Sequence, residues 1–252
     1  MATAPSRAHS FDSAAAEYAA HRPGYPPALF AAVEDRLGRP LTGARAADVG
    51  AGTGIATALL HGRGARVTAV EPGVAMADQL RRAHPRIPLV RGDGNALPFA
   101  DASLDLLTFA QSWHWTDLPR AGAEARRVLR PGGVLALWWN LADTGADWIA
   151  AQTDRILARS ATADLPGVAA THPGFTPALP DTLAFTRHQF PWSREVPLDG
   201  HLANLATHST FLISPADETR AFFDAEREIL LRAFPDGRVR EDYVTHLFLA
   251  TR

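Results

Sequence analysis

The stretch Ala44-Arg45-Ala46-Ala47-Asp48-Val49-Gly50-Ala51-Gly52-Thr53-Gly54 decides the fold. Its first part, Ala44–Val49, is an apolar run typical of a buried strand, and three glycines follow before a helical pattern begins. Glycine has no side chain, so a ligand can lie against this backbone while the N-terminus of the following helix faces it. The stretch therefore predicts a nucleotide-type cradle between a strand and a helix.

Strand and helix patterns alternate on both sides of this cradle. The predicted strands are Ala44–Val49, Arg66–Val70, Ile87–Arg91, Leu104–Phe109, Val134–Trp139, Thr186–Val196 and Asp242–Thr251. The predicted helices are Phe11–Ala20, Ala28–Leu37, Gly54–Gly62, Val74–Ala83, Pro119–Leu129, Asp143–Arg159 and Pro215–Phe234. Residues 161–180 are rich in Pro, Gly and Thr and are expected to form an irregular connection. Continuous apolar strands joined by helices indicate an α/β, doubly wound, mostly parallel sheet that is covered on both faces.

Composition narrows the class of protein. The chain has 252 residues, of which 46% are hydrophobic, and this favours one domain over residues 1–252. A net charge of −2 provides no basic field for nucleic acid or anionic lipid, so neither is expected as a partner. The absence of cysteine excludes disulfides, thiolate zinc sites and a cysteine nucleophile. Residues 1–10 lack the apolar core of a signal peptide, so a cytoplasmic location is expected.

Two acidic residues after the next strands indicate which ligand the cradle takes. Glu71 ends the second predicted strand, where a carboxylate can accept hydrogen bonds from both hydroxyls of a ribose. Asp93 lies in the segment Arg91–Phe99 after the third strand and can accept from an adenine amino group. The dinucleotide fingerprint needs its third glycine where this chain has Ile55, so the spacing argues against NAD.

These segments resemble the cofactor motifs of a known family. Asp48–Gly54, Glu71 and Gly92–Phe99, followed by Gln111–Trp115 and Leu129–Gly133, look like those of class I S-adenosylmethionine-dependent methyltransferases. The resemblance covers roughly residues 44–140. It implies a doubly wound, seven-stranded sheet of the Rossmann-like type with a C-terminal antiparallel strand pair. S-adenosylmethionine is the cofactor that it implies.

The N-terminal part is similar to a narrower group. Tyr18 and the segment Arg22–Pro26 resemble a small-molecule subgroup that includes trans-aconitate methyltransferase-like enzymes. That resemblance implies an N-terminal helical lid over residues 1–40, a cofactor-binding core over 41–140, and substrate-side helices with closing strands over 141–252. In such a lid, Tyr18 and Arg22 would cover the cofactor and pair with its carboxylate.

The resemblance also implies roles for single residues. The cofactor-binding residues that it implies are Tyr18, Arg22, Asp48, Gly50, Gly52, Glu71, Asp93, Asn95, Ala96 and Gln111. Among them, Asp48, Gly50 and Gly52 would line the methionyl half, Glu71 would hold the ribose, and Gln111 would lie under the methionyl chain. Asp93, Asn95 and Ala96 would surround adenine. The expected substrate-binding residues are Trp113, Asn140, His208 and Ser209.

His114 is the candidate for a catalytic residue. It lies just past the fourth strand, at the carboxyl edge where doubly wound sheets bind ligands. A neutral imidazole there can act as a general base, or it can pack and hydrogen bond in the pocket wall. His201 and His208 have no third ligand at metal-binding spacing, so the chemistry is predicted to be metal-independent.

The predicted function is methyl transfer from S-adenosylmethionine to a small molecule, with a hydroxyl or carboxylate oxygen as the favoured acceptor. Such transfer needs in-line placement and exclusion of water more than acid catalysis. Two alternatives remain open at this stage: a protein that binds the cofactor and assists a non-methylating reaction such as a cyclisation, and a disfavoured NAD-dependent oxidoreductase. The oligomeric state is expected to be a monomer or a homodimer.

Overall fold

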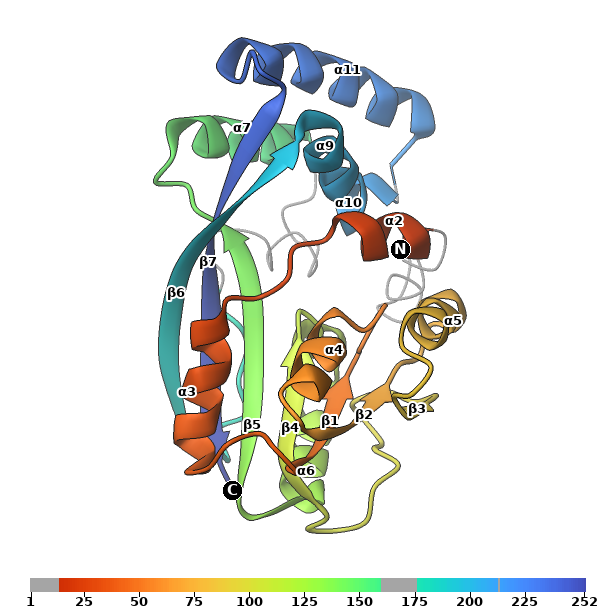
Figure 1. Cartoon of the computed structure of the whole chain (residues 1–252), viewed down its shortest axis with the longest axis vertical. Coiled ribbons are helices and arrows are strands. Elements are labelled where there is room, and N and C mark those ends of the chain that lie inside the picture. The colour runs from red at the N-terminus through yellow and green to blue at the C-terminus, as the bar shows by residue number, and fades with distance from the viewer. Residues whose placement is uncertain (1–13, 160–175, 213) are drawn as a thin grey trace.

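A seven-stranded sheet forms the centre of the computed structural model, which describes residues 14–159, 176–212 and 214–252. Its strands are β1 (Arg45–Val49), β2 (Arg66–Val70), β3 (Leu89–Val90), β4 (Leu104–Ala110), β5 (Leu129–Ala142), β6 (Phe185–Pro197) and β7 (Arg238–Thr251). Their order across the sheet is β3-β2-β1-β4-β5-β7-β6 (Figure 1). Strands β1 to β5 are parallel, whereas β7 pairs antiparallel with both β5 and β6. The predicted α/β sheet with its C-terminal antiparallel pair is confirmed.

Helices cover both faces of the sheet. They are α2 (Ala15–His21), α3 (Pro27–Leu37), α4 (Ile55–Gly62), α5 (Val74–Ala83), the short 3-10 helix η2 (Trp113–Trp115), α6 (Leu118–Val128), α7 (Asp147–Arg159), α9 (Leu198–Ala206), α10 (Ser209–Leu212) and α11 (Ala216–Ala233). Successive side chains of a strand point to opposite faces. Trp138 and Trp139 of β5 are nonetheless both fully buried, because Trp138 packs on the side of α3 and α4 and Trp139 on the side of α6.

The position of β1 in the sheet determines where a ligand can bind. The chain moves from β1 outward to β2 and β3, and then returns to place β4 on the other side of β1. The carboxyl ends of β1 and β4 are therefore separated by a crevice at a reversal of strand order, where doubly wound sheets bind ligands. The glycine stretch after Val49 and residues 111–117 after β4 both lie at this edge.

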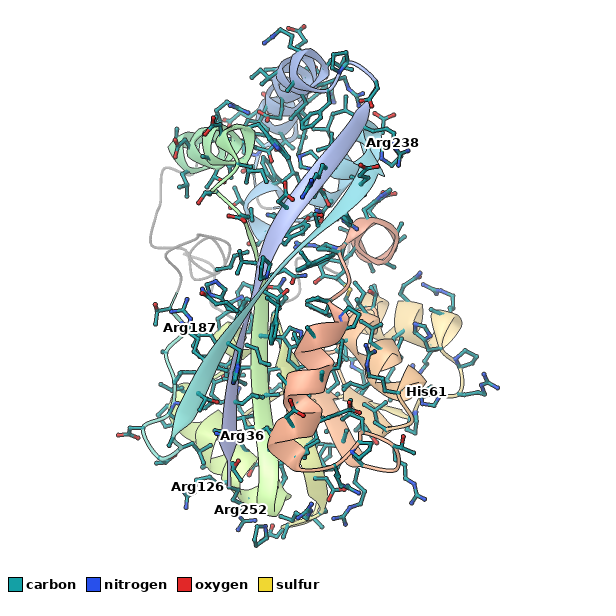
Figure 2. All side chains as sticks on the ribbon, turned by 60° about the vertical axis from the view of Figure 1, so that its left-hand side comes forward. Arg36, His61, Arg126, Arg187, Arg238 and Arg252 are labelled. Carbon is teal, nitrogen blue, oxygen red and sulfur yellow. The ribbon has the colours of Figure 1, made fainter. Side chains whose placement is uncertain are left out.

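Strands β6 and β7 carry a second group of helices beyond this edge. They form a long antiparallel ribbon that continues past the other strands to α7, α9 and α11 (Figure 1). Figure 2 labels Arg238 and Arg252 at opposite ends of the molecule, and these residues lie at the two ends of β7. Helix α2 crosses the space between the two parts and packs on α9. The fold thereby places α2 and α9 above the carboxyl edge.

The boundaries of several elements differ from the predictions. Strand β3 has only two residues, and β5 is longer than predicted because β7 pairs with it from Val134 to Ala142. Helix α7 begins at Asp147, since Asp143 forms a turn in which its Oδ1 accepts from Gly145 N. The prediction missed α9 and α10. Residues 11–13 of the predicted first helix and most of the predicted connection 161–180 lie outside the described residues.

No helix within the described ranges combines the length and the apolar character that a membrane span requires.

Candidate active site

A cavity of about 210 Å³ opens at the carboxyl ends of β1, β2 and β4. We call it the cofactor-side cavity. Seven of the residues predicted to bind the cofactor line it, namely Tyr18, Gly50, Gly52, Glu71, Asp93, Asn95 and Gln111. These residues come from five separate segments between α2 and β4. The structure therefore brings most of the predicted cofactor-binding residues together around one cavity.

The glycine stretch after β1 forms the floor of this cavity. Gly50, Gly52 and Gly54 have φ values of 66°, 57° and 93°, in the left-handed region that favours glycine. A Cβ on Gly50 would lie 2.5 Å from the Cβ of Ser112, so no larger residue fits without displacement. Gly54 then serves as the N-cap of α4, and its own Cβ would meet Leu80 at 2.9 Å. A cradle shaped by bare backbone beside a helix N-terminus fits a nucleoside cofactor such as S-adenosylmethionine.

Glu71 fixes the other wall of the cradle. Its Oε2 accepts a hydrogen bond from Gly52 N at 2.8 Å, and its Oε1 accepts from Gly73 N at 2.7 Å. The residue is 6% exposed and faces the cavity. Each carboxylate oxygen can accept more than one hydrogen bond, so these backbone contacts leave capacity for the two hydroxyls of a ribose.

Replacing Glu71 by Ala is expected to weaken the binding of S-adenosylhomocysteine by about tenfold or more. Each charge-assisted hydrogen bond contributes about 1.5–3 kcal/mol, and the change also frees Gly52 N from its partner. Isothermal titration calorimetry measures the affinity. Glu195→Ala, an exposed glutamate of β6, is the matched control. Equal affinities for Glu71→Ala and wild type would remove Glu71 from ribose binding.

The segment after β3 supplies another wall of the cavity, where the sequence predicts adenine binding. Asp93 Oδ1 accepts from Asn95 N at 2.7 Å, and Asn95 Oδ1 accepts from Asp117 N at 2.8 Å, so both side chains shape the turn that faces the cavity. Ala96 is exposed and lies outside the cavity wall. Gly94 lines the cavity instead, and it packs so closely that a Cβ on it would come within 2.8 Å of the Phe109 ring. The sequence signal for this close packing was the glycine itself, inside the segment Arg91–Phe99.

Asp48 lies beneath the glycine stretch instead of lining the cavity. It is completely buried, where its Oδ2 accepts from Thr57 Oγ1 at 2.6 Å and its Oδ1 accepts from Thr108 Oγ1 at 2.7 Å. Burial raises the pKa of Asp48 from 3.8 to about 6, although the hydrogen bonds from both threonines oppose that rise. In this position Asp48 ties β1 to α4 and β4 and supports the cradle from below.

We expect Asp48→Asn to stabilise the protein at pH 8 and to have little effect at pH 3. The pKa of Asp48 is higher in the folded state than in the unfolded state. The free energy of unfolding therefore falls as the pH rises from about 4 to about 6, and it stays lower above pH 6. A difference of about two pH units corresponds to ~3 kcal/mol, which the neutral amide avoids. Urea unfolding of both proteins across this pH range measures the difference. Asp154→Asn on the exposed side of α7 is the control. A difference in unfolding free energy between wild type and Asp48→Asn that does not change with pH would contradict the raised pKa of Asp48.

A second, smaller cavity of about 70 Å³ adjoins the first on the side of the ribbon. We call it the ribbon-side cavity. Its wall contains Arg22, Asn140 and His208 among the predicted site residues, and also Trp148, Gln152, His201, Asn204, Glu241 and Tyr243. Gln111 lines both cavities, with a left-handed φ of 60° and its N–H donating to Trp138 O at 2.9 Å. The two cavities thus share one lining residue.

Helix α2 contributes to both cavities through different residues. Tyr18 lines the cofactor-side cavity, whereas Arg22 lines the ribbon-side cavity, although both were predicted to contact the cofactor. Arg22 donates through Nε to Thr207 Oγ1 at 2.8 Å and through Nη2 to Thr207 O at 3.1 Å. Arg194 also donates to His21 O at 2.7 Å. These contacts hold the predicted lid helix against α9 and β6.

Three other predicted residues lie outside both cavity walls. Trp113 is buried against Phe109, with ring centroids 4.8 Å apart, and its Nε1 donates to Ala178 O at 2.9 Å. His114 Nδ1 accepts a hydrogen bond from Trp139 Nε1 at 3.2 Å. Ser209 begins α10 and is half-buried. Trp115, which the prediction did not assign, is the residue of η2 that faces the cofactor-side cavity.

The described ranges contain no group of three or more His, Cys, Asp or Glu side chains placed to hold a metal ion.

Comparisons with known proteins agree with this geometry. A family model described as a methyltransferase domain matches residues 47–137. A Mycobacterium bovis protein named as an uncharacterized methyltransferase is 36% identical over 221 residues, which cover 88% of this chain and 85% of that protein. A solved structure from Anaeromyxobacter dehalogenans, given as a candidate type II methyltransferase, is 27% identical with a TM-score of 0.62 and covers 91% of this chain and 97% of that one. The chain therefore belongs to the class I S-adenosylmethionine-dependent methyltransferases.

Proposed function

We propose that this methyltransferase acts on an oxygen atom of a small molecule held in the ribbon-side cavity. The observation that carries the proposal is the position of Gln111, which lines the cofactor-side cavity and the ribbon-side cavity together. Two cavities that share a lining residue can present a methyl donor and an acceptor to each other over a short distance. A cavity of about 70 Å³ suits a small acceptor better than a polymer.

The cofactor-side cavity is expected to hold S-adenosylmethionine through backbone and carboxylate contacts. Glu71 binds the ribose, Asp93 and Asn95 form the adenine side, and Gly50 and Gly52 let the methionyl chain lie against the backbone. The bound cofactor supplies an electrophilic methyl group on a sulfonium. The protein's own part is to place the acceptor oxygen in line and to exclude water.

Helix α2 is proposed to exclude water as the lid of the site. Tyr18 lies on the cofactor side and Arg22 on the acceptor side, and the helix is anchored to α9 through Thr207. This arrangement supports the similarity to the trans-aconitate methyltransferase-like subgroup, in which the N-terminal segment carries the corresponding residues. A carboxylate acceptor needs no base and no metal, so the chemistry is proposed to be metal-independent.

The contacts of His114 favour a packing and hydrogen-bonding role over the general-base role. Because Trp139 donates to Nδ1, the neutral ring carries its hydrogen on Nε2 and has no free nitrogen to accept a proton. Burial also lowers the pKa of His114 to about 4, so the ring is a weak base. We infer that His114 orients Trp139 and η2.

His114→Ala is accordingly expected to lower kcat by less than about tenfold, with cofactor affinity nearly unchanged, because it removes packing and not the proton acceptor. A pH profile of kcat/KM separates the two roles. Trp139→Phe, which deletes the same hydrogen bond and leaves the imidazole, is the matched control and should give a similar loss. A fall of a hundredfold or more in His114→Ala alone, together with loss of an ionisation from the profile, would restore the general-base role.

The function itself is tested by following the methyl group. The protein is incubated with methyl-labelled S-adenosylmethionine and fractionated small-molecule extracts, and Glu71→Ala serves as the control with weakened cofactor binding. Label in a low-molecular-weight product as an ester or ether supports the proposal. Tight cofactor binding with an altered but unlabelled product would support the non-methylating alternative, and label in nucleic acid or protein would overturn the choice of acceptor.

A further inference from the structure

Arg22 brings a positive charge to the ribbon-side cavity that no described carboxylate balances. Its hydrogen bonds go to Thr207 Oγ1 and Thr207 O, both neutral, and its guanidinium lies 4.8 Å from the centroid of the Tyr18 ring. Among the described residues it forms no ion pair. These bonds use Nε and one hydrogen of Nη2, so the remaining N–H groups, including those of Nη1, are available to a ligand. A guanidinium in this state is suited to a carboxylate or another oxyanion.

The two carboxylates in the cavity wall do not fill this role. Glu241 accepts from His201 Nδ1 at 2.7 Å, from Arg194 Nε at 2.5 Å and from Tyr243 OH at 2.9 Å. Asp242 accepts from Arg240 Nε at 2.9 Å. Each carboxylate therefore has an arginine of its own. Arg22 also lines the cavity, but no described carboxylate pairs with it.

Asn204 also lines this cavity, and it carries a buried hydrogen-bond acceptor without a partner among the described residues. Its Nδ2 donates to Tyr243 OH at 3.2 Å and to Glu241 Oε1 at 3.4 Å. The hydroxyl hydrogen of Tyr243 is donated to Glu241, so the Tyr243 oxygen can only accept from Asn204. The carboxylate of Glu241 also only accepts, so both neighbours need the NH2 group of Asn204 as a donor. The amide orientation is thus fixed by chemistry. Asn204 is 3% exposed, and its Oδ1 has no hydrogen-bond partner among the described residues.

A wider network holds Asn204 in this orientation. His201 must donate to Glu241 from Nδ1, so its Nε2 accepts from Gln152 Nε2 at 3.0 Å. Gln152 donates in turn to Glu226 Oε1 at 2.9 Å, and Arg155 pairs with the same carboxylate. Among the buried side-chain polar atoms of this network that the structure describes, Oδ1 of Asn204 is the one without a hydrogen-bond partner. An unpaired buried carbonyl destabilises the fold, and a hydrogen bond from a ligand or a bound water can offset this.

We propose that the acceptor is a small hydroxy acid, whose carboxylate binds to Arg22 and whose hydroxyl donates to Asn204 Oδ1. This inference rests on the proposed function and specifies its substrate class. A neutral alcohol leaves the arginine without an anion, and a simple acid leaves the amide oxygen without a donor. Specificity of this kind is strong because each missing group leaves a buried polar atom of the protein unpaired.

Fragment probes test the inference without knowledge of the natural acceptor. The wild-type protein is saturated with S-adenosylhomocysteine, and glycolate, acetate and glycolamide are titrated by ligand-observed NMR. Glycolate carries both groups, acetate only the anion, and glycolamide only the hydroxyl. We expect glycolate to bind at least about tenfold more tightly than either of the others. Equal affinity for acetate overturns the role of Asn204, equal affinity for glycolamide overturns that of Arg22, and no binding overturns the proposal.

Variants assign the two preferences to their residues. Arg22→Gln should lower the affinity for glycolate to that of glycolamide, and Asn204→Leu should lower it to that of acetate. Both variants should bind S-adenosylhomocysteine within about twofold of the wild-type affinity. Arg227→Gln, an exposed arginine of α11, is the control. If Asn204→Leu does not fold, Asn204→Ser is used, and the wild-type ranking decides alone if neither folds.

The result for Arg22→Gln also separates two kinds of failure. A loss of S-adenosylhomocysteine affinity with an unchanged ranking of the probes would assign Arg22 to the methionyl carboxylate and overturn this inference, while the proposed function stands. Failure of the proposed function has a different signature, which is the absence of label from every small-molecule product in the presence of bound cofactor.

Discussion

Gly50→Ala is expected to lower the affinity for S-adenosylhomocysteine by about a hundredfold or more and to destabilise the protein. A residue with a Cβ at φ of 66° costs about 1–2 kcal/mol in strain. The new Cβ would in addition lie 2.5 Å from the Cβ of Ser112, an atom next to the backbone that cannot swing away. Ser112 is also held by its Oγ, which donates to Val49 O at 2.5 Å. The glycine stretch must therefore move, and a displacement of about 1 Å can cost a hundredfold at a positioned site.

Gly38→Ala separates strain from displacement. Gly38 has a φ of 67°, almost the same as Gly50, but a Cβ there would meet nothing within 4 Å. It ends α3, away from both cavities. In urea unfolding, Gly38→Ala should lower the free energy of unfolding by the strain energy alone. In calorimetry, it should bind S-adenosylhomocysteine as tightly as wild type does. If Gly50→Ala binds S-adenosylhomocysteine as Gly38→Ala does, the close approach at Ser112 does not shape the cradle.

The sequence was sufficient to predict that most of the proposed cofactor-binding residues lie together, because this information is local. The glycine stretch, Glu71 and residues 92–99 each follow a strand directly, and parallel strands bring their carboxyl ends to one edge. The pattern could not show in which direction Asp48 points. Neighbouring side chains of a strand alternate between faces, and the position of Thr57 and Thr108 decided that this carboxylate is buried beneath the stretch.

The composition of the ribbon-side cavity could not be predicted in this way. The ribbon-side cavity is assembled from α2, β5, α7, α9 and β7, whose residues are far apart in the sequence. His201, Asn204 and Glu226 suggest a solvent-facing surface in a sequence pattern, but each is buried and hydrogen bonds to partners that are distant in the sequence. This is also why α9 was missed, since two of its five buried residues are polar. Trp113 and Ser209, which were predicted to bind substrate, lie outside the wall of this cavity, and the ring of Trp113 packs on Phe109 instead.

Glu241→Ala is expected to reduce the free energy of unfolding by about 3–5 kcal/mol, which urea unfolding measures at pH 7. The side chain is 2% exposed and accepts hydrogen bonds from Arg194, His201, Asn204 and Tyr243. Its removal leaves a largely buried guanidinium without its counter-charge and several donors without an acceptor, and breaking such a pair costs about this much. The ribbon-side cavity should lose its shape as well, because Glu241 fixes the amide of Asn204.

Two comparisons make the Glu241 prediction specific. Glu195→Ala removes an exposed glutamate of β6, 3.7 Å from Arg238, and should cost at most about 0.5 kcal/mol.

Burial alone would raise the pKa of Glu241, but His201 and Arg194 outweigh it and hold the pKa below its ordinary 4.5. A lowered pKa stabilises the fold above pH 4.5, and this contribution is lost as the pH falls through the folded-state pKa. The gap between wild type and Glu241→Ala should accordingly narrow in acid, and Arg194→Met should cost less in the Glu241→Ala background than in wild type. A cost below about 1 kcal/mol, or a gap that is constant from pH 7 to pH 3, would show that Glu241 does not hold α9 to the ribbon.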